Sequence, residues 1–474
     1  MKSAQLTTVP AQLTPIVISL SIHEELCRIC ESLVLISDTF IRNIHLMAKY
    51  SQYNVRIPMS ANTDVLYNTA SDKFIAIRRN TELKDISELS GSLTQLLLDN
   101  QMIVPEELDE RGEVIAQWEK SVKSETGFFL IINPTLRCNF NCWYCYENHK
   151  NTIEMSADVI NKIKGLIDSI VPEIETLDIS FFGGEPLLEF SRIVEPLIVY
   201  AENVTASHNK EVRFSFTTNG FLLTPEMIDC LAGHRVSFLQ ITLDGGRKSH
   251  NKTRISKTKD SFGTITSNIV QLLDHKIHVT LRINVTPDNI DDCEDILNWI
   301  NGLTGEQTQY ITVNVQQVWQ TERTEEFAAK IDCLLDSFTR CGIRAYPAIM
   351  DNLRQMCYAD RANTLLVNTD GNIFKCTAVD FENAANDSNI FSDTWKQDLS
   401  TKFEKRLKKR FANHNCLTCR IFPLCMGGCH KRVVSQAETD YCLFTDREEA
   451  QKYLVLSIIK DRVRRDALNK LIQQ

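Results

Sequence analysis

The sequence lacks a hydrophobic run long enough to cross a membrane. The apolar stretch near its start, TPIVISLSI, has nine residues and is interrupted by His23-Glu24-Glu25, whereas a membrane-spanning helix needs about 20 apolar residues. No lysine-rich segment with an apolar run and an Ala-x-Ala site precedes it. The sequence therefore predicts neither a signal peptide nor a membrane span, and we expect a cytoplasmic protein.

The sequence also lacks an excess of basic residues. It has 52 Lys and Arg against 61 Asp and Glu, a formal net charge of −9 and a pI near 5.7. Because phosphate backbones require a basic surface, nucleic acid is disfavoured as the main partner. Internal repeats and low-complexity linkers are absent as well. A hydrophobic share of 43% is ordinary for a soluble enzyme, and 474 residues predict about two to four domains.

Cysteine, by contrast, is abundant. The 16 cysteines gather in short spaced groups, which favours metal ligation in a reducing cytosol over a disulfide framework. Cys138, Cys142 and Cys145 form a C-x3-C-x2-C triplet directly after the apolar run FFLIINP. Three such thiolates can bind three irons of a 4Fe-4S cluster and leave the fourth iron open. A structural zinc site needs a fourth ligand and rarely uses this spacing, so iron–sulfur is favoured over zinc.

From residue 126 the chain alternates strand-like and helix-like stretches. Runs rich in β-branched or aromatic residues occur at 128–134, 176–184, 212–220, 237–246, 278–286 and 310–318. Between them, apolar residues recur at helical spacing, as in Val159, Ile163, Leu166 and Ile170; Ile265, Ile269 and Leu272; and Phe327, Ile331 and Leu334. Six βα units in a row imply a curled parallel sheet walled by helices, with chemistry at the C-terminal strand ends.

The ends of these strands carry polar motifs. The second strand ends in Gly183-Gly184-Glu185-Pro186, where glycines permit close backbone approach to a ligand and a carboxylate suits a cationic amino group. The following strands end in Thr217-Thr218-Asn219-Gly220 and in Thr242-Leu243-Asp244-Gly245, and the fifth carries Arg282 and Asn284. An arginine can pair bidentately with a carboxylate. Each residue could equally be a cap or sheet-end hydrogen bonder, but together they suit the ribose and carboxylate of a cofactor.

With the aromatic Tyr144 before its last cysteine, the triplet resembles the signature of the radical SAM superfamily. Gly-Gly-Glu-Pro matches that superfamily's motif, and Thr-Leu-Asp-Gly resembles its Ser-Leu-Asp-Gly. His250 to Arg254 is similar to a His-Asp-x-x-Arg stretch with Asn251 in place of the acid, which questions any acid role there. The resemblance implies a partial (β/α)6 TIM-like barrel. It also implies S-adenosylmethionine as cofactor, bound through Tyr144, Gly183, Gly184, Glu185, Thr218, Asn219, Thr242, Asp244 and Arg282.

A second block of seven cysteines lies near the C-terminus. The block begins at Cys357. Gly371 follows after thirteen residues and Cys376 after four more, and then come Cys416-x2-Cys419-x5-Cys425-x3-Cys429 and Cys442. Paired short spacings often bind zinc, but the block resembles the SPASM domain in all seven cysteines. By that resemblance, one auxiliary 4Fe-4S cluster is held by Cys416, Cys419, Cys425 and Cys442, and another by Cys357, Cys376 and Cys429.

The second auxiliary group shows only three ligands. Either Cys341 or Cys333 supplies a fourth, or one iron is open. With the triplet, the resemblance implies three 4Fe-4S clusters. The remaining Cys27, Cys30, Cys230 and Cys293 lie in helical contexts and are expected to be buried small hydrophobes.

The first 125 residues have a different pattern. A helix-like segment at 15–48 is followed by two short strand runs around Thr69-Ala70-Ser71-Asp72, which predict a hairpin. The next stretch predicts a helix with one apolar face, formed by Leu83, Ile86, Leu89, Leu93 and Leu97. A further helix is expected at 108–122, with Ile115 and Trp118. A hairpin followed by helices resembles the winged-helix-like α+β modules with which peptide-modifying enzymes bind leader peptides. A lid on the barrel is the equal alternative.

The expected organisation is α/β, with an N-terminal module at 1–125, a radical SAM core at 126–345, an iron–sulfur SPASM domain at 346–450 and a C-terminal helix at 451–474. The resemblance implies an oxidoreductase that makes a thioether or carbon–carbon cross-link in a ribosomally made peptide. Its expected partners are a precursor peptide with a leader and a flavodoxin- or ferredoxin-type electron donor. An anaerobic sulfatase-maturing enzyme is the alternative. An electron-transfer scaffold would not need the strand-end motifs.

Overall fold

The computed structural model describes residues 48–83, 85–123, 126–147, 149, 153–255, 259–352, 357–435, 440–442, 444 and 446–473. The helix-like segment expected at 15–48 lies outside the described residues except for Ala48, as do Cys27 and Cys30. The chain forms two compact units. One unit contains the chain up to Gly112 with Cys419–Pro423 and Glu448–Leu456; the other contains Glu113–Thr418, Leu424–Arg447 and Ser457–Gln474.

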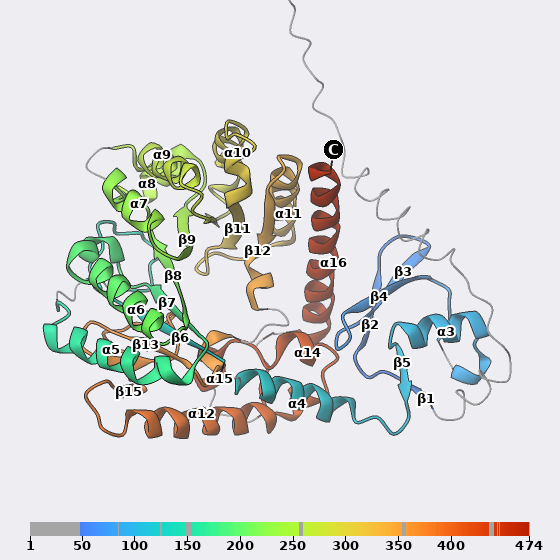
Figure 1. The fold of residues 1–474 in the computed structure, drawn as a ribbon. Coiled ribbons are helices and arrows are strands. Elements are labelled where there is room, and N and C mark those ends of the chain that lie inside the picture. Colours follow the sequence, from blue (N-terminus) through green and yellow to red (C-terminus); the bar gives the residue numbers. More distant parts are fainter. Residues whose placement is uncertain are drawn as a thin grey trace, which may run out of the picture. The chain divides into compact units, whose positions relative to one another are not determined.

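The larger unit is built on one sheet in which the six predicted strands are all present. They are β6 (Gly127–Ile132), β7 (Thr176–Phe181), β8 (Glu211–Thr218), β9 (Val236–Leu243), β10 (Val279–Val285) and β11 (Ile311–Gln317), and β12 (Arg344–Pro347) adds a seventh. All of them pair in parallel with their sequence neighbours. This order of parallel neighbours confirms the predicted α/β fold with its partial barrel (Figure 1).

Helices follow the strands and cover the outer side of the curved sheet (Figure 1). They are α5 (Ala157–Ile170), α6 (Glu195–Ser207), α7 (Pro225–Ala232), α8 (Arg247–Thr253), α9 (Ser261–Asp274), α10 (Glu294–Asn301) and α11 (Glu325–Arg340). Short helical turns lie at Val171–Glu173, Pro186–Glu189, Phe190–Val194, Ile290–Cys293, Gln307–Tyr310, Ala348–Asn352 and Tyr358–Asp360.

The three predicted apolar helix faces are confirmed. Val159, Ile163, Leu166 and Ile170 of α5, and Ile265, Ile269 and Leu272 of α9, are all buried. On α11, Phe327 and Leu334 are buried, while Ile331 is half-buried against the same core. These helices start at side-chain caps, since Ser156, Asp260 and Thr324 each accept a hydrogen bond from a backbone amide three residues on.

The C-terminal part of the larger unit extends the same sheet. β13 (Thr364–Val367) pairs in parallel with β6, and β14 (Asn372–Phe374) and β15 (Ser388–Asn389) continue it antiparallel. The domain boundary expected at 345/346 therefore falls inside one compact unit, because the later strands complete the sheet. Further helices are α4 (Glu110–Val122), α12 (Trp395–Phe411), α13 (His414–Leu417), α14 (Phe422–Cys425), α15 (His430–Ser435) and α16 (Arg447–Ile472), of which α4, α14 and α16 contribute residues to both units.

The boundary expected at 125/126 also differs from the division into units, which begins the larger unit at Glu113. The reason is the apolar face of α4. Trp118 and Val122 are buried with Phe403 and Leu407 of α12 in one hydrophobic group. The predicted helix with Trp118 is therefore present, but it belongs mostly to the larger unit.

In the smaller unit, β2 (Asn54–Pro58), β3 (Thr63–Asn68) and β4 (Lys73–Arg78) form an antiparallel sheet. The register Asn68↔Lys73 confirms the predicted hairpin around 69–72. β1 (Ala48–Tyr50) pairs with β5 (Ile103–Pro105). The single helical face predicted from Leu83 to Leu97 is broken: a turn at Ile86–Glu88 is followed by α3 (Gly91–Asp99), because Leu89 is extended and Ser90 caps α3.

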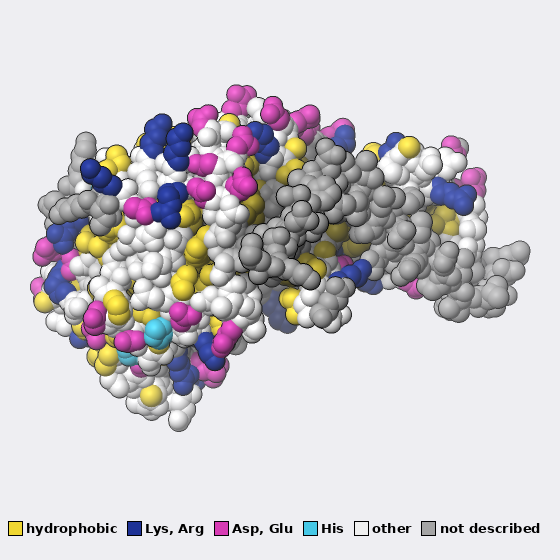
Figure 2. Space-filling model, turned by 90° about the horizontal axis from the view of Figure 1, so that it is seen from above, with side chains coloured by type: hydrophobic (Ala, Val, Ile, Leu, Met, Phe, Trp, Pro, Cys, Tyr) yellow, Lys and Arg dark blue, Asp and Glu magenta, His cyan; other side chains and the backbone are white. Residues whose placement is uncertain are grey.

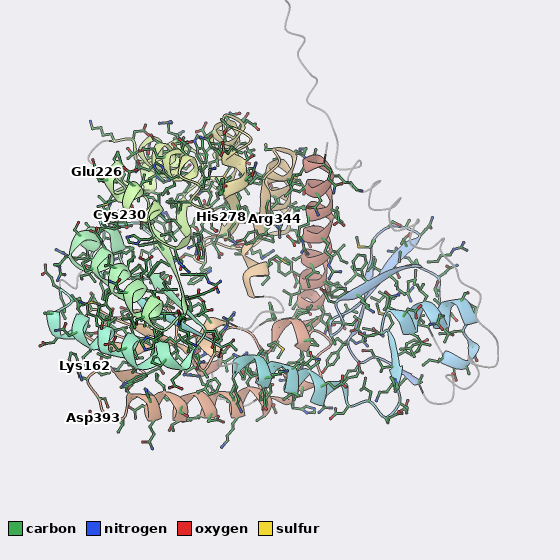
Figure 3. All side chains as sticks on the ribbon, in the orientation of Figure 1. Lys162, Glu226, Cys230, His278, Arg344 and Asp393 are labelled. Atoms are coloured by element: carbon green, nitrogen blue, oxygen red, sulfur yellow. The ribbon has the colours of Figure 1, made fainter. Side chains whose placement is uncertain are left out.

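Two cysteines outside the spaced groups lie in helical surroundings. Cys293 is 1% exposed, as expected of a buried small hydrophobe. Cys230, on α7 (Figure 3), is half-buried, and its thiol contacts the Glu195 carboxylate at 3.6 Å.

None of the described helices is both long enough and apolar enough to span a membrane. On the described surface seen in Figure 2, Lys and Arg side chains are interspersed with Asp and Glu. That face therefore offers no continuous basic track, in keeping with the acidic composition.

Candidate active site at the strand ends

A cavity open to solvent lies at the C-terminal strand ends of the barrel. Its lining comes from the loop after β6 and from the ends of β7 to β11. Eleven predicted residues line it: Cys138, Cys142, Tyr144, Cys145, Gly183, Gly184, Thr218, Asn219, Thr242, Arg282 and Asn284. Residues from five strand ends and the triplet thus meet in one place, as the barrel geometry predicts.

The loop with the cysteine triplet rests on the end of β7. The backbone amides of Gly184 and Glu185 donate to the carbonyls of Thr135 (3.1 Å) and Arg137 (2.8 Å). A Cβ on Gly184 would lie 2.2 Å from the Arg137 carbonyl oxygen, and Gly183 has φ of +103°. These glycines are therefore required by the close approach of two backbone segments, which the sequence interpretation had attributed to the ligand.

Glu185 does not face the cavity. It is fully buried, and its carboxylate accepts from the Thr218 hydroxyl (2.6 Å), the Asn219 amide (2.8 Å) and the Leu187 amide (3.0 Å). Burial raises the pKa of Glu185. Its carboxylate thus links the ends of β7 and β8, and the expected contact of this side chain with the cofactor's amino group stays a prediction.

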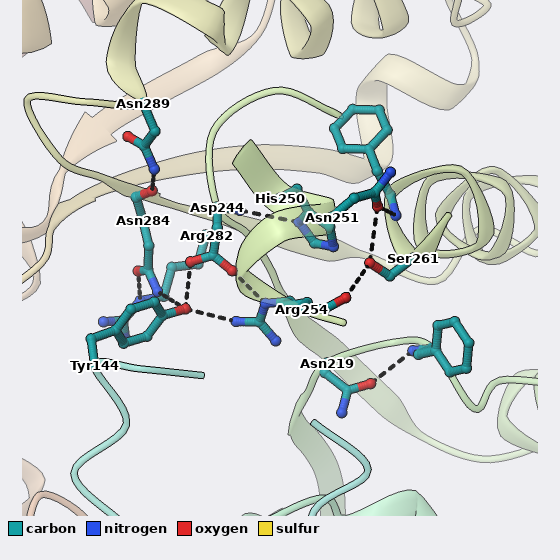
Figure 4. Close-up of polar contacts among 12 residues, drawn as sticks. Tyr144, Asn219, Asp244, His250, Asn251, Arg254, Ser261, Arg282, Asn284 and Asn289 are labelled. Carbon is teal, nitrogen blue, oxygen red and sulfur yellow. Dashed lines mark hydrogen bonds and ion pairs between the residues drawn. The ribbon is translucent and has the colours of Figure 1, made fainter. Parts of the chain in front are cut away.

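Tyr144 is the centre of a buried hydrogen-bond network (Figure 4). Its hydroxyl donates to Asp244 and accepts from Arg254 Nη2 (3.1 Å) and Asn284 Nδ2 (3.0 Å). Asp244 also pairs with Arg254, and both side chains are nearly inaccessible to solvent. Arg282 Nε in turn donates to Asn284 at 2.9 Å. The network ties the triplet loop to β9, β10 and the segment after α8.

Asp244, like Glu185, lies behind the cavity wall and is 1% exposed. Its side chain contacts Tyr144 and Arg254, and its backbone amide donates to His250 Nδ1 at 3.2 Å. Burial lowers the pKa of His250 to about 3, so this imidazole is neutral and can accept. The Asp244 side chain thus contacts the cavity-lining residues Tyr144 and Arg254, and its expected contact with the cofactor stays a prediction.

Asn251 has a structural task. Its side-chain oxygen accepts from Ser261 Oγ (3.0 Å) and the Phe262 amide (2.9 Å), and its Nδ2 donates to Asp260 at 3.0 Å. It therefore ties α8 to the start of α9. These contacts use an amide as both donor and acceptor, and they agree with the doubt about an acid role at this position.

The triplet cysteines suit an iron–sulfur cluster. Burial raises the pKa of Cys138 to about 12, and it raises the pKa values of Cys142 and Cys145. Such thiols become thiolates when a metal supplies positive charge. The Phe140 amide and Asn219 Nδ2 approach the Cys138 sulfur at 3.5 and 3.9 Å. The three thiolates could therefore bind a cluster, with the Phe140 amide and Asn219 Nδ2 as neighbours of the Cys138 sulfur. The amide and hydroxyl side chains of the cavity could hold S-adenosylmethionine.

Among the described residues, no three Cys, His, Asp or Glu side chains converge as they would around one metal ion. A cubane spaces its thiolates more widely than a single ion does, since each thiolate binds a different iron.

Sequence reasoning missed part of the wall. Tyr146, Glu147, Gln317, Trp319 and Gln320 all line the cavity. Tyr146 and Trp319 stack with ring centroids 6.0 Å apart. Burial raises the pKa of Glu147 to about 7. Their position just after the triplet and just after the sixth strand was the available signal.

Three C-terminal cysteines interact electrostatically. Burial raises the pKa of Cys357, and the Asp360 carboxylate and then the Cys376 and Cys429 thiols raise it further. Cys341, a proposed fourth ligand, caps α11 and accepts a hydrogen bond from Asn301. Cys333, the other candidate, is exposed on α11. Neither cysteine has a contact that joins it to the group of three.

The Cys416 and Cys442 segments are also joined. Asn413 Oδ1 accepts from the Cys416 amide at 3.3 Å, and its Nδ2 donates to the carbonyl of Tyr441, beside Cys442, at 2.9 Å. Cys419 belongs to the smaller unit, where Gln451 Nε2 lies 3.8 Å from its sulfur.

Comparison with known proteins agrees with this geometry. Residues 132–300 match the Radical SAM superfamily. An uncharacterized protein of Methanocaldococcus jannaschii is 24% identical over 53% of this chain and 85% of its own length. The radical SAM cyclopropyl synthase TigE of Paramaledivibacter caminithermalis is 26% identical over 33% of this chain, and the Fe-coproporphyrin III synthase of Methanosarcina barkeri is 29% identical over 36%. The chain spans only 34% and 40% of these two relatives.

Among solved structures, anSMEcpe with bound AdoMet and Kp18Cys peptide, an anaerobic sulfatase-maturating enzyme, has a similar fold. The TM-score is 0.56 at 18% identity, over 72% of this chain and 99% of that one. Because residues 132–300 match the superfamily, the chain contains a radical SAM domain, and such domains catalyse radical reactions with a 4Fe-4S cluster and S-adenosylmethionine.

Proposed function

We propose that this enzyme modifies a ribosomally made peptide and joins two of its side chains by a thioether or a carbon–carbon bond. The observation that carries the proposal is a contact between the cavity lining and the segment of Cys376. Tyr146, which lines the cavity, donates its hydroxyl to the carbonyl of Thr377 at 3.1 Å. Thr377 directly follows Cys376, one of the three grouped cysteines. A peptide in the cavity would lie beside that group.

When bound, the cluster and S-adenosylmethionine supply a 5′-deoxyadenosyl radical after a one-electron reduction, for which we propose a flavodoxin- or ferredoxin-type donor. Cys138, Cys142 and Cys145 would hold this cluster. Thr218, Asn219, Thr242 and Arg282 would orient the cofactor through their hydroxyl, amide and guanidinium groups. Glu185 and Asp244 act behind them by fixing the positions of Thr218 and of Tyr144 with Arg254. A peptide bound over the cavity would exclude water from it and so protect the radical.

Two auxiliary clusters complete the proposed set. Cys416, Cys419, Cys425 and Cys442 would hold one, and Cys357, Cys376 and Cys429 the other. The Cys341 thiol makes a hydrogen bond with Asn301, and we therefore do not assign it to the three-cysteine cluster. We favour an open iron in that cluster. A substrate thiolate is the soft ligand that fits it. Such binding would place a sulfur beside the carbon radical and let the cluster accept the surplus electron.

Iron content tests the cluster set. Anaerobically reconstituted protein should hold about three 4Fe-4S clusters, roughly twelve irons per chain. Replacing Cys138, Cys142 and Cys145 together with Ala should abolish 5′-deoxyadenosine formation and leave roughly eight irons. About four irons in the wild type, or stoichiometric zinc, would contradict the auxiliary clusters. Cofactor cleavage in the triple variant would place the radical site elsewhere.

We further propose that residues 50–125 bind the leader of the precursor peptide. The hairpin and α3 of the smaller unit support this, and a lid is the alternative. Deleting the segment is a poor test, because Thr69 donates to the Arg420 carbonyl beside Cys419. Its loss would disturb a proposed cluster ligand as well.

Hydrogen exchange on the intact enzyme separates the two roles. The leader-containing peptide should protect backbone amides within 48–112, and the same peptide without its leader should not. Equal protection by both peptides, or protection by neither, would make the segment a lid or a stabilising extension.

Sulfatase maturation is the second candidate, favoured by the fold shared with anSMEcpe. The two functions differ in product. A maturase of this second type oxidises a Cys or Ser to formylglycine, whereas a cross-link removes two hydrogens and joins two residues. Tandem mass spectrometry of a peptide offered with a Cys and a second acceptor residue distinguishes them, since only a cross-link suppresses fragmentation between the joined residues.

A further inference from the structure

A buried hydrogen-bonded group joins the segments of Cys357 and Cys429. Asp360 ends the turn that follows Cys357, and its amide donates to the Cys357 carbonyl at 2.8 Å. His430 directly follows Cys429 and starts α15. Asp360 Oδ1 lies 2.7 Å from His430 Nδ1, and the two side chains are 7% and 6% exposed. Two predicted ligands of one cluster are therefore connected through their neighbours.

Arg410, in the last turn of α12, adds a third segment to this group. Its side chain is 3% exposed, and its Nη2 donates to Asp360 Oδ2 at 2.9 Å. Its Nη1 donates to the carbonyl oxygens of Gly428, at 3.1 Å, and Met426. One guanidinium thus binds both the Cys357 segment and the loop that leads to Cys429.

The loop is shaped around this guanidinium. Met426, Gly427 and Gly428 have φ values of 48°, 80° and 81°, a left-handed path that is unfavourable for a methionine. A Cβ on Gly427 would lie 3.2 Å from both Cγ and Nη1 of Arg410. The two carbonyls bonded to Arg410 hold this unfavourable backbone in place, and Gly427 leaves room for the side chain.

We propose that Arg410, acting through Asp360 and the Met426–Gly428 loop, positions Cys357 and Cys429 as ligands of one iron–sulfur cluster. The inference rests on the proposed auxiliary clusters and assigns this role to residues outside the cysteine motif. Arginine is needed because three acceptors at different angles require a planar fork of donors, which lysine lacks.

The test uses full-length protein reconstituted anaerobically. Arg410→Lys keeps the charge and loses the fork, and Arg410→Gln loses both. Each should reduce iron from roughly twelve to roughly eight per chain, or shift the reduction potential of one cluster. The electron paramagnetic resonance signal that is lost or shifted should be the one that Cys376→Ala removes. Gly427→Ala should alter the same signal without removing a charge.

Arg464→Lys is the matched control, because Arg464 is 7% exposed and paired with Asp332 and Asp336 between α16 and α11. It should lower the melting temperature but keep all iron. If Arg410 acts through Asp360, the double variant Asp360→Asn, Arg410→Gln should lose no more cluster than either single variant.

Wild-type iron near four per chain would overturn the auxiliary clusters and this inference with them. Full wild-type iron, with unchanged iron, signals and potentials in Arg410→Lys and Gly427→Ala, would overturn this inference alone. Because Gly427→Ala leaves the ion pair intact, the test stands even where Arg410→Gln does not fold.

Discussion

Removal of the Tyr144 hydroxyl is the sharpest test of the network that supports the cavity. Tyr144→Phe keeps the ring but deletes three hydrogen bonds: the one that the hydroxyl donates to the Asp244 carboxylate, and the ones that it accepts from Arg254 and from Asn284. A hydrogen bond to a charged group contributes about 1.5–3 kcal/mol, and a buried donor left without a partner costs about 1–3 kcal/mol. Arg254 keeps its pairing with Asp244, so the main uncompensated donor is Asn284.

The expected loss in the free energy of unfolding is therefore about 2–4 kcal/mol. Anaerobic thermal unfolding of the apo protein and of the reconstituted protein should show a drop of several degrees in both. Arg254 and Asn284, which each lose a hydrogen bond to Tyr144, line the cavity. We therefore also expect S-adenosylmethionine to bind roughly ten-fold more weakly, equivalent to about 1.4 kcal/mol. Isothermal titration calorimetry measures that change.

Tyr200→Phe is the matched control. Its hydroxyl also bonds a carboxylate, at 2.8 Å from each oxygen of Asp168, but at the protein surface. Exposed bonds of this kind change stability by about 0.5 kcal/mol or less. Equal melting temperatures for the two variants, or unchanged cofactor affinity in Tyr144→Phe, would refute the assignment of Tyr144 as the centre of the network.

Three further changes test other parts of the structure. Gly184→Ala places a Cβ 2.2 Å from the Arg137 carbonyl oxygen and should reduce iron at the triplet, whereas Gly165→Ala, in a helix with nothing within 4 Å, should be neutral or stabilising by up to about 1 kcal/mol; equal iron in both would contradict the close approach. The pKa of His250 is about 3 when folded against a usual 6.5, so the unfolded state binds the proton first and stability should fall as pH drops from 6.5 toward 3, by about 1.4 kcal/mol per pH unit for this group; a His250→Asn variant with the same pH slope in urea unfolding would argue against it. A Cys-containing peptide should shift the auxiliary-cluster resonance in the wild type and equally in Cys341→Ala; a shift confined to the variant would show that Cys341 closes the site.

Much of the fold followed from local patterns. Alternating apolar periods located six strands and the helices between them, because each element buries one face against the next. The hairpin at 69–72 was predictable because two short strand runs lie on either side of these residues. The triplet and the strand-end motifs line one cavity, since parallel strands bring their C-terminal ends to one edge. The break between Ile86 and Gly91 was not predicted, because the apolar spacing continues across it while Ser90 starts a new helix.

The sequence by itself determined which residue types occur in which order, and so the radical SAM domain and its barrel, and it predicts the ligands of the first cluster. Only the tertiary structure decided where side chains point. Glu185 and Asp244 look like cofactor ligands in sequence, yet burial turns both carboxylates toward Thr218 and Arg254. Trp319 and Arg410 belong to no motif, and they contact residues that are distant in the chain: Tyr146, and Asp360. Hydrogen bonds between such residues depend on packing across the sheet, which no local spacing records.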